Sequence, residues 1–131
     1  MIVLDTHVLV WWLTQAPGLS TAAKRAIGKH SAVGEVVAST ISLLEIATAI
    51  RRGRLQFNVP VDQWLADARS IPELRFEPVS VEIASLAGSF LEPVHGDPAD
   101  RIIAATATVL GAALVTADDR LRGLPSLRAI W

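Results

Sequence analysis

Cysteine is absent from this sequence of 131 residues, and histidine occurs only three times. Without cysteine the chain can form no disulfide bond, no zinc site with thiolate ligands and no cysteine nucleophile. Any metal ion must therefore be bound by oxygen atoms or by imidazole. Long hydrophobic runs are also lacking, because the stretch 8–13 is far shorter than the roughly 20 apolar residues that cross a bilayer. We therefore expect no membrane-spanning segment.

A strong excess of charge of one sign is missing as well. The formal net charge is -1, so a nucleic-acid substrate would have to be held by a local basic patch or through bound cations. Hydrophobic residues make up 51% of the chain, and the mean hydropathy of +0.41 suggests an apolar surface kept for a partner. We expect a single domain over residues 1–131. The N-terminus has no basic segment and no cleavage site, which predicts a cytoplasmic protein.

Short apolar runs alternate with segments of helical spacing along the chain. The predicted strands span residues 2–5, 35–39, 76–79, 112–116 and 127–130. The predicted helices span residues 21–28, 40–50, 61–70, 81–91 and 98–110, and a further helix follows residue 5. The proline in the third strand places that strand near an edge. This alternation predicts an α/β fold with a parallel sheet covered on both faces.

Four acids follow strands or stand in the first turn of the next helix: Asp5, Glu45, Asp100 and Asp118. Right-handed crossovers bring the carboxyl ends of parallel strands to one edge of the sheet. Carboxylates that lie close together repel one another unless protons or a cation neutralise them. Mg²⁺ or Mn²⁺ suits such hard oxygen ligands. Metal-dependent hydrolysis of a phosphodiester is the reaction class that follows.

The acids of the segment 97–100 also have a structural interpretation. Asp97 followed by Pro98 is the pattern of an N-cap with proline at the first helical position. Asp100 could simply favour the helix dipole. However, Asp100 shares its helix face with Ile103 and Ala104, which are expected to pack on the protein. An acid with only a solvated role is not expected on that face.

Other polar residues leave similar alternatives open. Asp5 or Thr6 could cap the helix that follows, and Ser42 and Glu45 have the spacing of a capping box. A basic cluster follows near the end of this helix, where cations are favoured by the dipole. Its members are the best candidates for phosphate contacts, and they are Arg51, Arg52 and Arg54.

Four segments, in this order, resemble the motifs of PIN-domain ribonucleases, and more narrowly those of the VapC toxins of bacterial toxin–antitoxin pairs. The first is Leu-Asp-Thr-His-Val-Leu-Val-Trp-Trp-Leu at 4–13. The second is Ser-Thr-Ile-Ser-Leu-Leu-Glu-Ile-Ala at 39–47, with Gly-Arg-Leu at 53–55. The third and fourth are His-Gly-Asp-Pro-Ala-Asp-Arg-Ile-Ile-Ala-Ala-Thr-Ala at 95–107 and Leu-Val-Thr-Ala-Asp-Asp at 114–119. The resemblance covers nearly the whole chain.

The resemblance implies a three-layer α/β/α sandwich around a central, mostly parallel sheet of about five strands. It implies a Mg²⁺-dependent (or Mn²⁺-dependent) endoribonuclease in which a metal-activated water hydrolyses RNA. The catalytic and metal-binding acids would be Asp5, Glu45, Asp100 and Asp118, with Thr116 as a supporting hydroxyl. The main role of Asp97 would be to cap the helix, and it could also contact the metal ion from outside the nearest ligands. Asp119 could share the metal-binding role of Asp118.

The resemblance also implies partners. These are an RNA substrate, a second copy of the chain in a homodimer, and a VapB-type antitoxin whose tail fills an apolar groove near the site. DNA would be bound only through the antitoxin, and no membrane contact is implied. Trp11 and Trp12 are candidates for the groove or an interface, although adjacent residues on a helix point about 100° apart and cannot be equally buried.

One departure concerns the second motif. The family commonly has an aromatic residue where Leu44 stands and a lysine near Ala49, so the RNA phosphate contact could fall to Arg51 or Arg52. The alternative to an enzyme is a catalytically inactive PIN-like module that binds protein or RNA. A phosphotransfer receiver domain also gathers acids at strand ends, but the lysine it needs at a late strand end is absent.

Overall fold

A single parallel sheet forms the centre of the computed structural model, which describes residues 1–91 and 97–131. The strand order is β3–β2–β1–β4–β5, and all four neighbouring pairs are parallel. The strands are β1 (Ile2–Leu4), β2 (Val36–Ser39), β3 (Leu74–Glu77), β4 (Ala113–Val115) and β5 (Ala129–Ile130). The predicted sheet is confirmed, including the edge position of β3. Residues 95 and 96 of the third motif lie outside the described residues.

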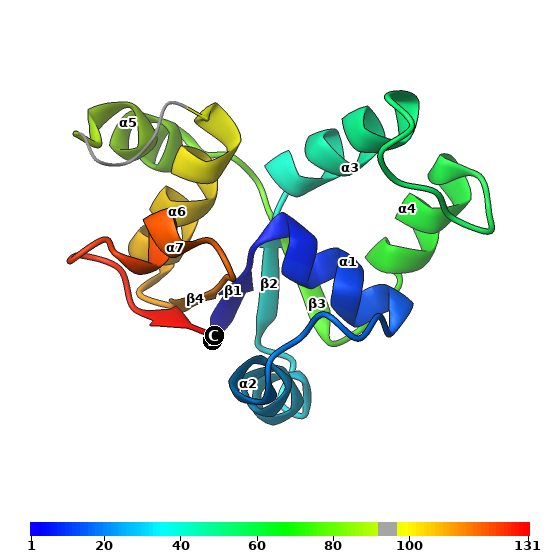
Figure 1. Ribbon diagram of the computed structural model, residues 1–131. Coiled ribbons are helices and arrows are strands. Elements are labelled where there is room, and N and C mark those ends of the chain that lie inside the picture. The colour runs from blue at the N-terminus through cyan, green and yellow to red at the C-terminus, as the bar shows by residue number, and fades with distance from the viewer. Residues whose placement is uncertain (92–96) are drawn as a thin grey trace.

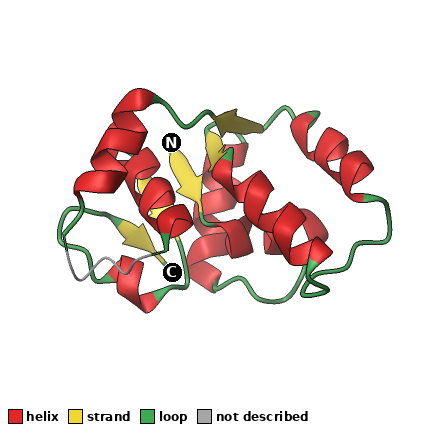
Figure 2. Ribbon diagram, turned by 90° about the horizontal axis from the view of Figure 1, so that it is seen from above, coloured by secondary structure: helices red, strands yellow, loops and turns green. Residues whose placement is uncertain are grey.

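Helices cover both faces of the sheet (Figures 1 and 2). They are α1 (Thr6–Thr14), α2 (Thr21–Ser31), α3 (Ile41–Arg51), α4 (Val61–Arg69), α5 (Val81–Ser89), α6 (Pro98–Leu110) and α7 (Asp119–Arg122). One core cluster joins a sheet face to α1, α2 and α3, and the other joins the opposite face to α6 and α7. The expected three-layer sandwich is therefore confirmed. The short helix α7 was not predicted, because four residues are too few to show a helical period.

Burial on both faces explains why the strands consist of continuous apolar runs. In β1, Ile2 and Leu4 belong to one core cluster and Val3 to the other, and each is at most 1% exposed. The same alternation occurs in β2, where Val36 and Val37 face opposite sides. A strand with solvent on one face would instead alternate apolar and polar residues.

The ends of α6 follow the signals in the sequence. Asp97 is the N-cap and its Oδ1 accepts a hydrogen bond from the amide of Ala99 at 3.0 Å. Pro98 occupies the first turn, where no amide is needed. Gly111 ends the helix with a left-handed φ of 64°, a conformation that glycine adopts without steric cost. The third motif therefore holds its acids at a fixed point beside the sheet.

No helix within the described parts of the chain is both long enough and apolar enough to cross a membrane.

Candidate active site

Asp5 lies at the carboxyl end of β1 and is fixed by hydrogen bonds of its amide and of both carboxylate oxygens. Its amide donates to the carbonyl of Val115 at 3.0 Å, and its Oδ1 accepts from the amide of Thr6 at 2.8 Å. Its Oδ2 accepts from the hydroxyl of Thr116 at 2.6 Å. The side chain is both the N-cap of α1 and a buried acid with 7% of its surface exposed. The interpretation of Asp5 as a helix cap is therefore confirmed, and its role as an active-site acid stays a prediction.

Thr116 connects the ends of β1 and β4. Its Oγ1 donates to Asp5 and accepts from the amide of Asp118 at 3.0 Å. Asp118 in turn caps α7, since its Oδ1 accepts from the amide of Arg120 at 2.9 Å. The neighbouring Asp119 has a side chain that is 92% exposed and pairs with Arg122 at 3.1 Å. Asp118 is thus the acid that points to the interior side of this turn.

Thr6 holds Glu45 in place across the gap between α1 and α3. Its Oγ1 donates to Oε1 of Glu45 at 2.5 Å and lies 2.9 Å from Oγ of Ser42. The residue before α3 is Thr40, which makes no capping hydrogen bond with its side chain. The capping-box interpretation of Ser42 and Glu45 is therefore wrong, because both side chains turn inward to α1. The sequence offered Thr6 only as an alternative cap of the helix after Asp5, whereas the structure gives the cap to Asp5 and makes Thr6 the partner of Glu45.

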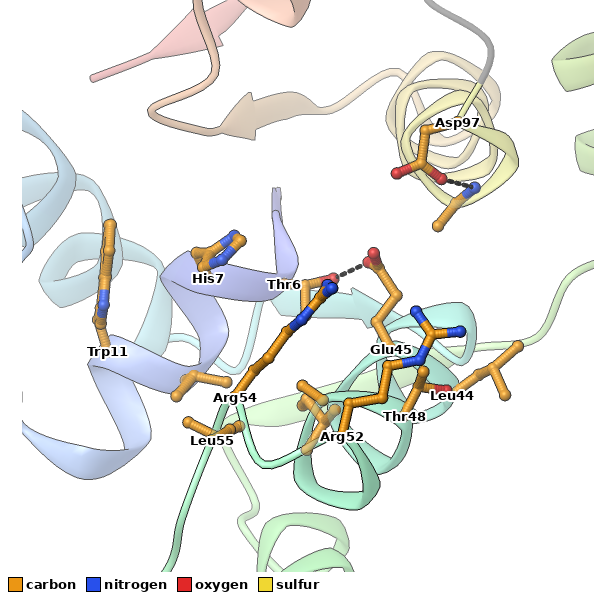
Figure 3. Close-up of a pocket in the computed structure, with 14 residues that line it drawn as sticks. Thr6, His7, Trp11, Leu44, Glu45, Thr48, Arg52, Arg54, Leu55 and Asp97 are labelled. Carbon is orange, nitrogen blue, oxygen red and sulfur yellow. Dashed lines mark hydrogen bonds between the residues drawn. The ribbon is translucent and has the colours of Figure 1, made fainter.

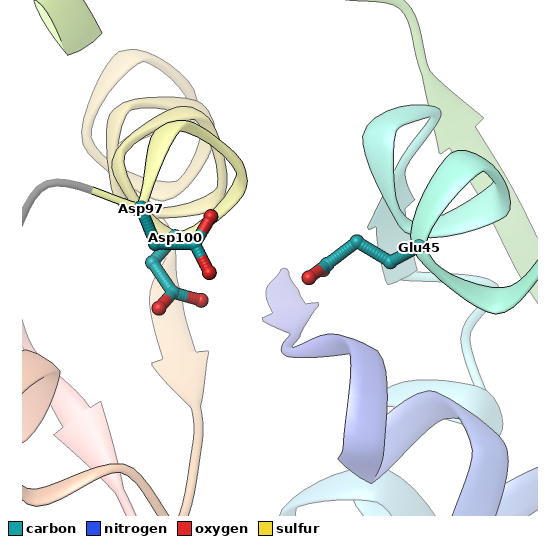
Figure 4. A group of neighbouring side chains, drawn as sticks. All are labelled: Glu45, Asp97 and Asp100. Atoms are coloured by element: carbon teal, nitrogen blue, oxygen red, sulfur yellow. The ribbon is translucent and has the colours of Figure 1, made fainter. Parts of the chain in front are cut away.

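Three carboxylates from two helices meet beside this network (Figure 4). Glu45 from α3 faces Asp97 and Asp100 from the start of α6, and one oxygen of each lies within 4.8 Å of the others. The sequence predicted Glu45 and Asp100 here, but it gave Asp97 a capping role first. Asp97 does cap α6, and the same carboxylate stands in the cluster.

The pKa values show that the predicted acids interact with one another. Burial raises the pKa of Asp100 to about 7, with further contributions from the charges of Asp5, Asp97, Glu45 and Asp118. Burial also raises the pKa of Asp5 and of Glu45. Each of these side chains holds its proton more tightly than an exposed acid does. The structure thus brings all four predicted acids into one electrostatic group, together with Asp97.

This group has the composition that a hard divalent cation requires. Its donors are carboxylate oxygens within 4.8 Å of one another, and oxygen is the ligand that Mg²⁺ and Mn²⁺ take in proteins. A cation between them would favour the charged forms of acids whose pKa is raised by burial and mutual repulsion. The residues therefore fit a divalent metal site, with Glu45, Asp97 and Asp100 as the nearest set.

A cavity of about 620 Å³ opens from the acid cluster along α1 and α3 (Figure 3). Glu45 and Asp97 line it, together with Arg52 and Arg54. Arg51, the other predicted phosphate contact, is exposed and is not among the described residues that line the cavity. Gly53, with φ 71°, stands between Arg52 and Arg54 in the turn that follows α3.

The double role of Asp97 leads to a test with two matched variants. Asp97→Ser keeps a capping oxygen but removes the carboxylate, whereas Asp97→Ala removes both. We expect Asp97→Ala to be less stable than Asp97→Ser by about 1 kcal/mol in the free energy of unfolding. Both variants should bind Mn²⁺ more weakly than the parent protein. Thermal melting and metal titration check this, and equal melting of the two variants would contradict the capping role.

Comparison with known proteins gives one family. The model of the PIN domain matches residues 2–127. The chain is 37% identical to Ribonuclease VapC22 of Mycobacterium tuberculosis over 121 residues, which cover 92% of this chain and 89% of that protein.

Solved structures show the same fold at low sequence identity. A VapBC2 complex from Rickettsia felis, bound to a promoter DNA fragment, has a TM-score of 0.73 at 18% identity, with 98% of this chain and 97% of that chain covered. A DNA-bound VapBC from Salmonella typhimurium has a TM-score of 0.70 at 18% identity, with 98% and 95% covered. The family model, the close relative and the shared fold together show that this chain belongs to the PIN domain family.

Proposed function

We propose that this chain is a Mg²⁺-dependent or Mn²⁺-dependent endoribonuclease and the toxin of a type II toxin–antitoxin pair. The observation that carries the proposal is the convergence of Glu45, Asp97 and Asp100 beside the buried Asp5. Without a bound cation such a group lowers the stability of the fold, because its carboxylates repel one another. A fold without a metal site would gain nothing from it. The relative that is 37% identical is named a ribonuclease, which gives the substrate class.

A bound metal ion and the protein side chains would have different roles in the reaction. A divalent cation bound by these acids would lower the pKa of a water molecule and offset the charge that develops on the phosphodiester. The protein holds the acids for this purpose: Thr116 orients Asp5, and Thr6 orients Glu45. We assign metal binding to Asp5, Glu45, Asp100 and Asp118, with Asp97 as a further ligand.

Substrate binding is assigned to the basic side of the cavity. Arg52 lines the cavity beside Glu45, and a guanidinium there can form two hydrogen bonds to one phosphate. Arg51 stays a proposed contact for a more distant part of the RNA. The positive charge of these arginines attracts RNA phosphates locally, whereas the net charge of -1 of the whole chain does not.

The partners proposed for the chain follow from its relatives. Solved structures with the same fold come from toxin–antitoxin complexes, two of them with DNA. We propose that this chain forms a homodimer, is inhibited by a VapB-type antitoxin, and meets DNA only through that antitoxin. We also propose that it acts in the cytoplasm, where its RNA substrate would be found.

Cleavage of a mixed RNA pool by the purified protein tests the proposal. We expect cleavage with Mg²⁺ or Mn²⁺, none with EDTA, and none with Asp5→Asn, because that variant removes a charge from the centre of the cluster. Asp62→Asn is the matched control, since Asp62 is an exposed acid on α4. If folded protein binds RNA and cuts it under neither metal, the enzyme proposal fails and a catalytically inactive binding module remains.

A further inference from the structure

Arg101 joins the start of α6 to the end of α5. Its Nε donates a hydrogen bond to the carbonyl of Ala87 at 3.1 Å, and its Nη2 donates to the carbonyl of Phe90. Ala87 lies in the last turn of α5 and Phe90 follows its last residue, in the region where a helix has carbonyls without partners of its own. A cation is also favoured there by the helix dipole. One guanidinium thus binds the end of α5 from the neighbouring helix.

The same residue closes the turn that carries two of the acids. The amide of Arg101 donates to the carbonyl of Asp97 at 3.2 Å, within the first turn of α6. Asp97 and Asp100 both belong to this turn, and their carboxylates lie opposite that of Glu45 (Figure 4). Adjacent residues on a helix point about 100° apart, so Asp100 can face Glu45 while Arg101 faces α5. The turn therefore lies between the acid cluster and α5.

Packing holds this turn less firmly than the middle of α6. The side chains of residues 103–107 are all buried, whereas Asp97 and Pro98 are exposed and residues 99–102 are half-buried. Helix ends fray where few buried contacts hold them, and repulsion among the acids favours a wider spacing when no cation is bound. The hydrogen bonds of Arg101 oppose both effects, because they tie the turn to a helix that packs along α6 (Figure 1).

We propose that Arg101 is a positioning residue of the metal site. By binding the end of α5 it holds the first turn of α6, and with it Asp97 and Asp100, at the distance from Glu45 at which one divalent ion can contact all three carboxylates. The inference rests on the metal-dependent function proposed above. It assigns a part in that function to a cationic side chain, which cannot itself be a metal ligand.

The charge of Arg101 makes the expected effect distinctive. A cation close to the acids repels a bound metal ion. An arginine that acted there only through its charge would therefore weaken metal binding, and its removal would tighten binding. A positioning residue has the opposite effect, because its removal lets the ligands move apart. The two roles differ in the sign of the change in metal affinity.

Titration of the metal-free protein with Mn²⁺, followed by the electron paramagnetic resonance of the free ion, tests the inference. Arg101→Met keeps an apolar stem but removes the hydrogen bonds of the guanidinium. We expect it to weaken Mn²⁺ binding by about 10-fold, the lower end of the loss typical when a residue that orients metal ligands is removed. Arg101→Lys keeps the charge but not the forked geometry, so its affinity should lie between those of Arg101→Met and the parent protein.

Arg128→Met is the matched control. The Nη2 of Arg128 donates to the carbonyl of Gly111 at 3.3 Å, which is the same kind of contact at the opposite end of α6. Its loss can lower the stability of the protein, but it does not release the turn that carries the acids. The Mn²⁺ affinity of Arg128→Met should therefore equal that of the parent protein.

Amide hydrogen exchange of the metal-free proteins, measured by NMR, gives a readout that needs neither metal nor RNA. The amides of residues 99 and 101 both donate to Asp97. They should exchange faster in Arg101→Met than in the parent protein, and no faster in Arg128→Met. If Arg101→Met does not fold, Arg101→Lys takes its place in both measurements, with a smaller change of the same sign expected.

Several outcomes would overturn the inference while leaving the proposed function intact. These are Mn²⁺ binding by a folded Arg101→Met protein that is as tight as that of the parent or tighter, and unchanged exchange of the first-turn amides. An equal loss of affinity in Arg128→Met would do the same, because the effect would then reflect general stability. If the parent protein itself bound no Mn²⁺, the proposed metal-dependent function would fail, and the inference with it.

Discussion

Asparagine in place of Asp100 is expected to reduce metal-dependent RNA cleavage by at least about 10²- to 10³-fold, the loss typical when one group that stabilises the transition state is removed. Asp100 is the point at which the acids of the site meet, since the charges of Asp5, Asp97, Glu45 and Asp118 all raise its pKa. Asparagine has nearly the same shape, so the packing of α6 should not change. Initial rates of cleavage at saturating Mn²⁺ measure the effect.

Stability separates this result from a folding defect. Because the asparagine side chain carries no charge and does not repel the neighbouring acids, the metal-free Asp100→Asn variant should melt at or above the temperature of the parent protein at neutral pH. Asp62→Asn again serves as the control for an exposed acid. Full cleavage activity in a folded Asp100→Asn protein would remove Asp100 from the site.

The metal-free protein is expected to lose stability as the pH rises from about 4 to about 7. In this interval the carboxyl of Asp100 keeps its proton in the folded state, where its pKa is about 7, but loses it in the unfolded state, where the value is 3.8. The folded state then binds more protons than the unfolded state, so the free energy of unfolding falls with increasing pH. Solvent screens this half-buried group, and we expect a contribution on the order of 1 to 2 kcal/mol.

Chemical denaturation across this pH range, for the parent protein and for Asp100→Asn, measures the effect as a difference between the two. Other acids titrate in both proteins, and the difference isolates Asp100. Addition of Mn²⁺ at pH 7 should restore stability to the parent protein, since the ion binds only the folded, ionised cluster. Parallel stability curves for the two proteins without metal would contradict the raised pKa.

Local signals in the sequence predicted the elements of this fold well. Continuous apolar runs identified the strands because both faces of the sheet are buried, and Asp97 followed by Pro98 marked the start of α6. Gly111 marked the end of α6. Each of these features depends on residues that are close together in the chain, so the sequence alone is sufficient to predict them.

Where the local sequence pattern allowed more than one role for a side chain, contacts with residues distant in the chain showed which hydrogen bonds it makes. Asp5 had two interpretations, as a helix cap and as an active-site acid. The amide of Thr6 confirms the cap, while the other carboxylate oxygen accepts from Thr116, far along the chain, and the active-site role stays a prediction. The interpretation of Ser42 and Glu45 as a capping box failed because Thr6, thirty-nine residues before Glu45, offers a hydroxyl that the spacing along α3 cannot reveal.

By itself, the sequence determined the α/β architecture, since this follows from periodicity and order, and it predicted a set of acids; its four motifs carried the family resemblance. Only the tertiary structure decided that Asp97 joins Glu45 and Asp100, and that Arg54 rather than Arg51 lines the cavity with Trp11. The physical reason is that a site is defined by distances of a few ångströms between side chains on different elements. Those distances depend on how α1, α3 and α6 pack around the end of the sheet.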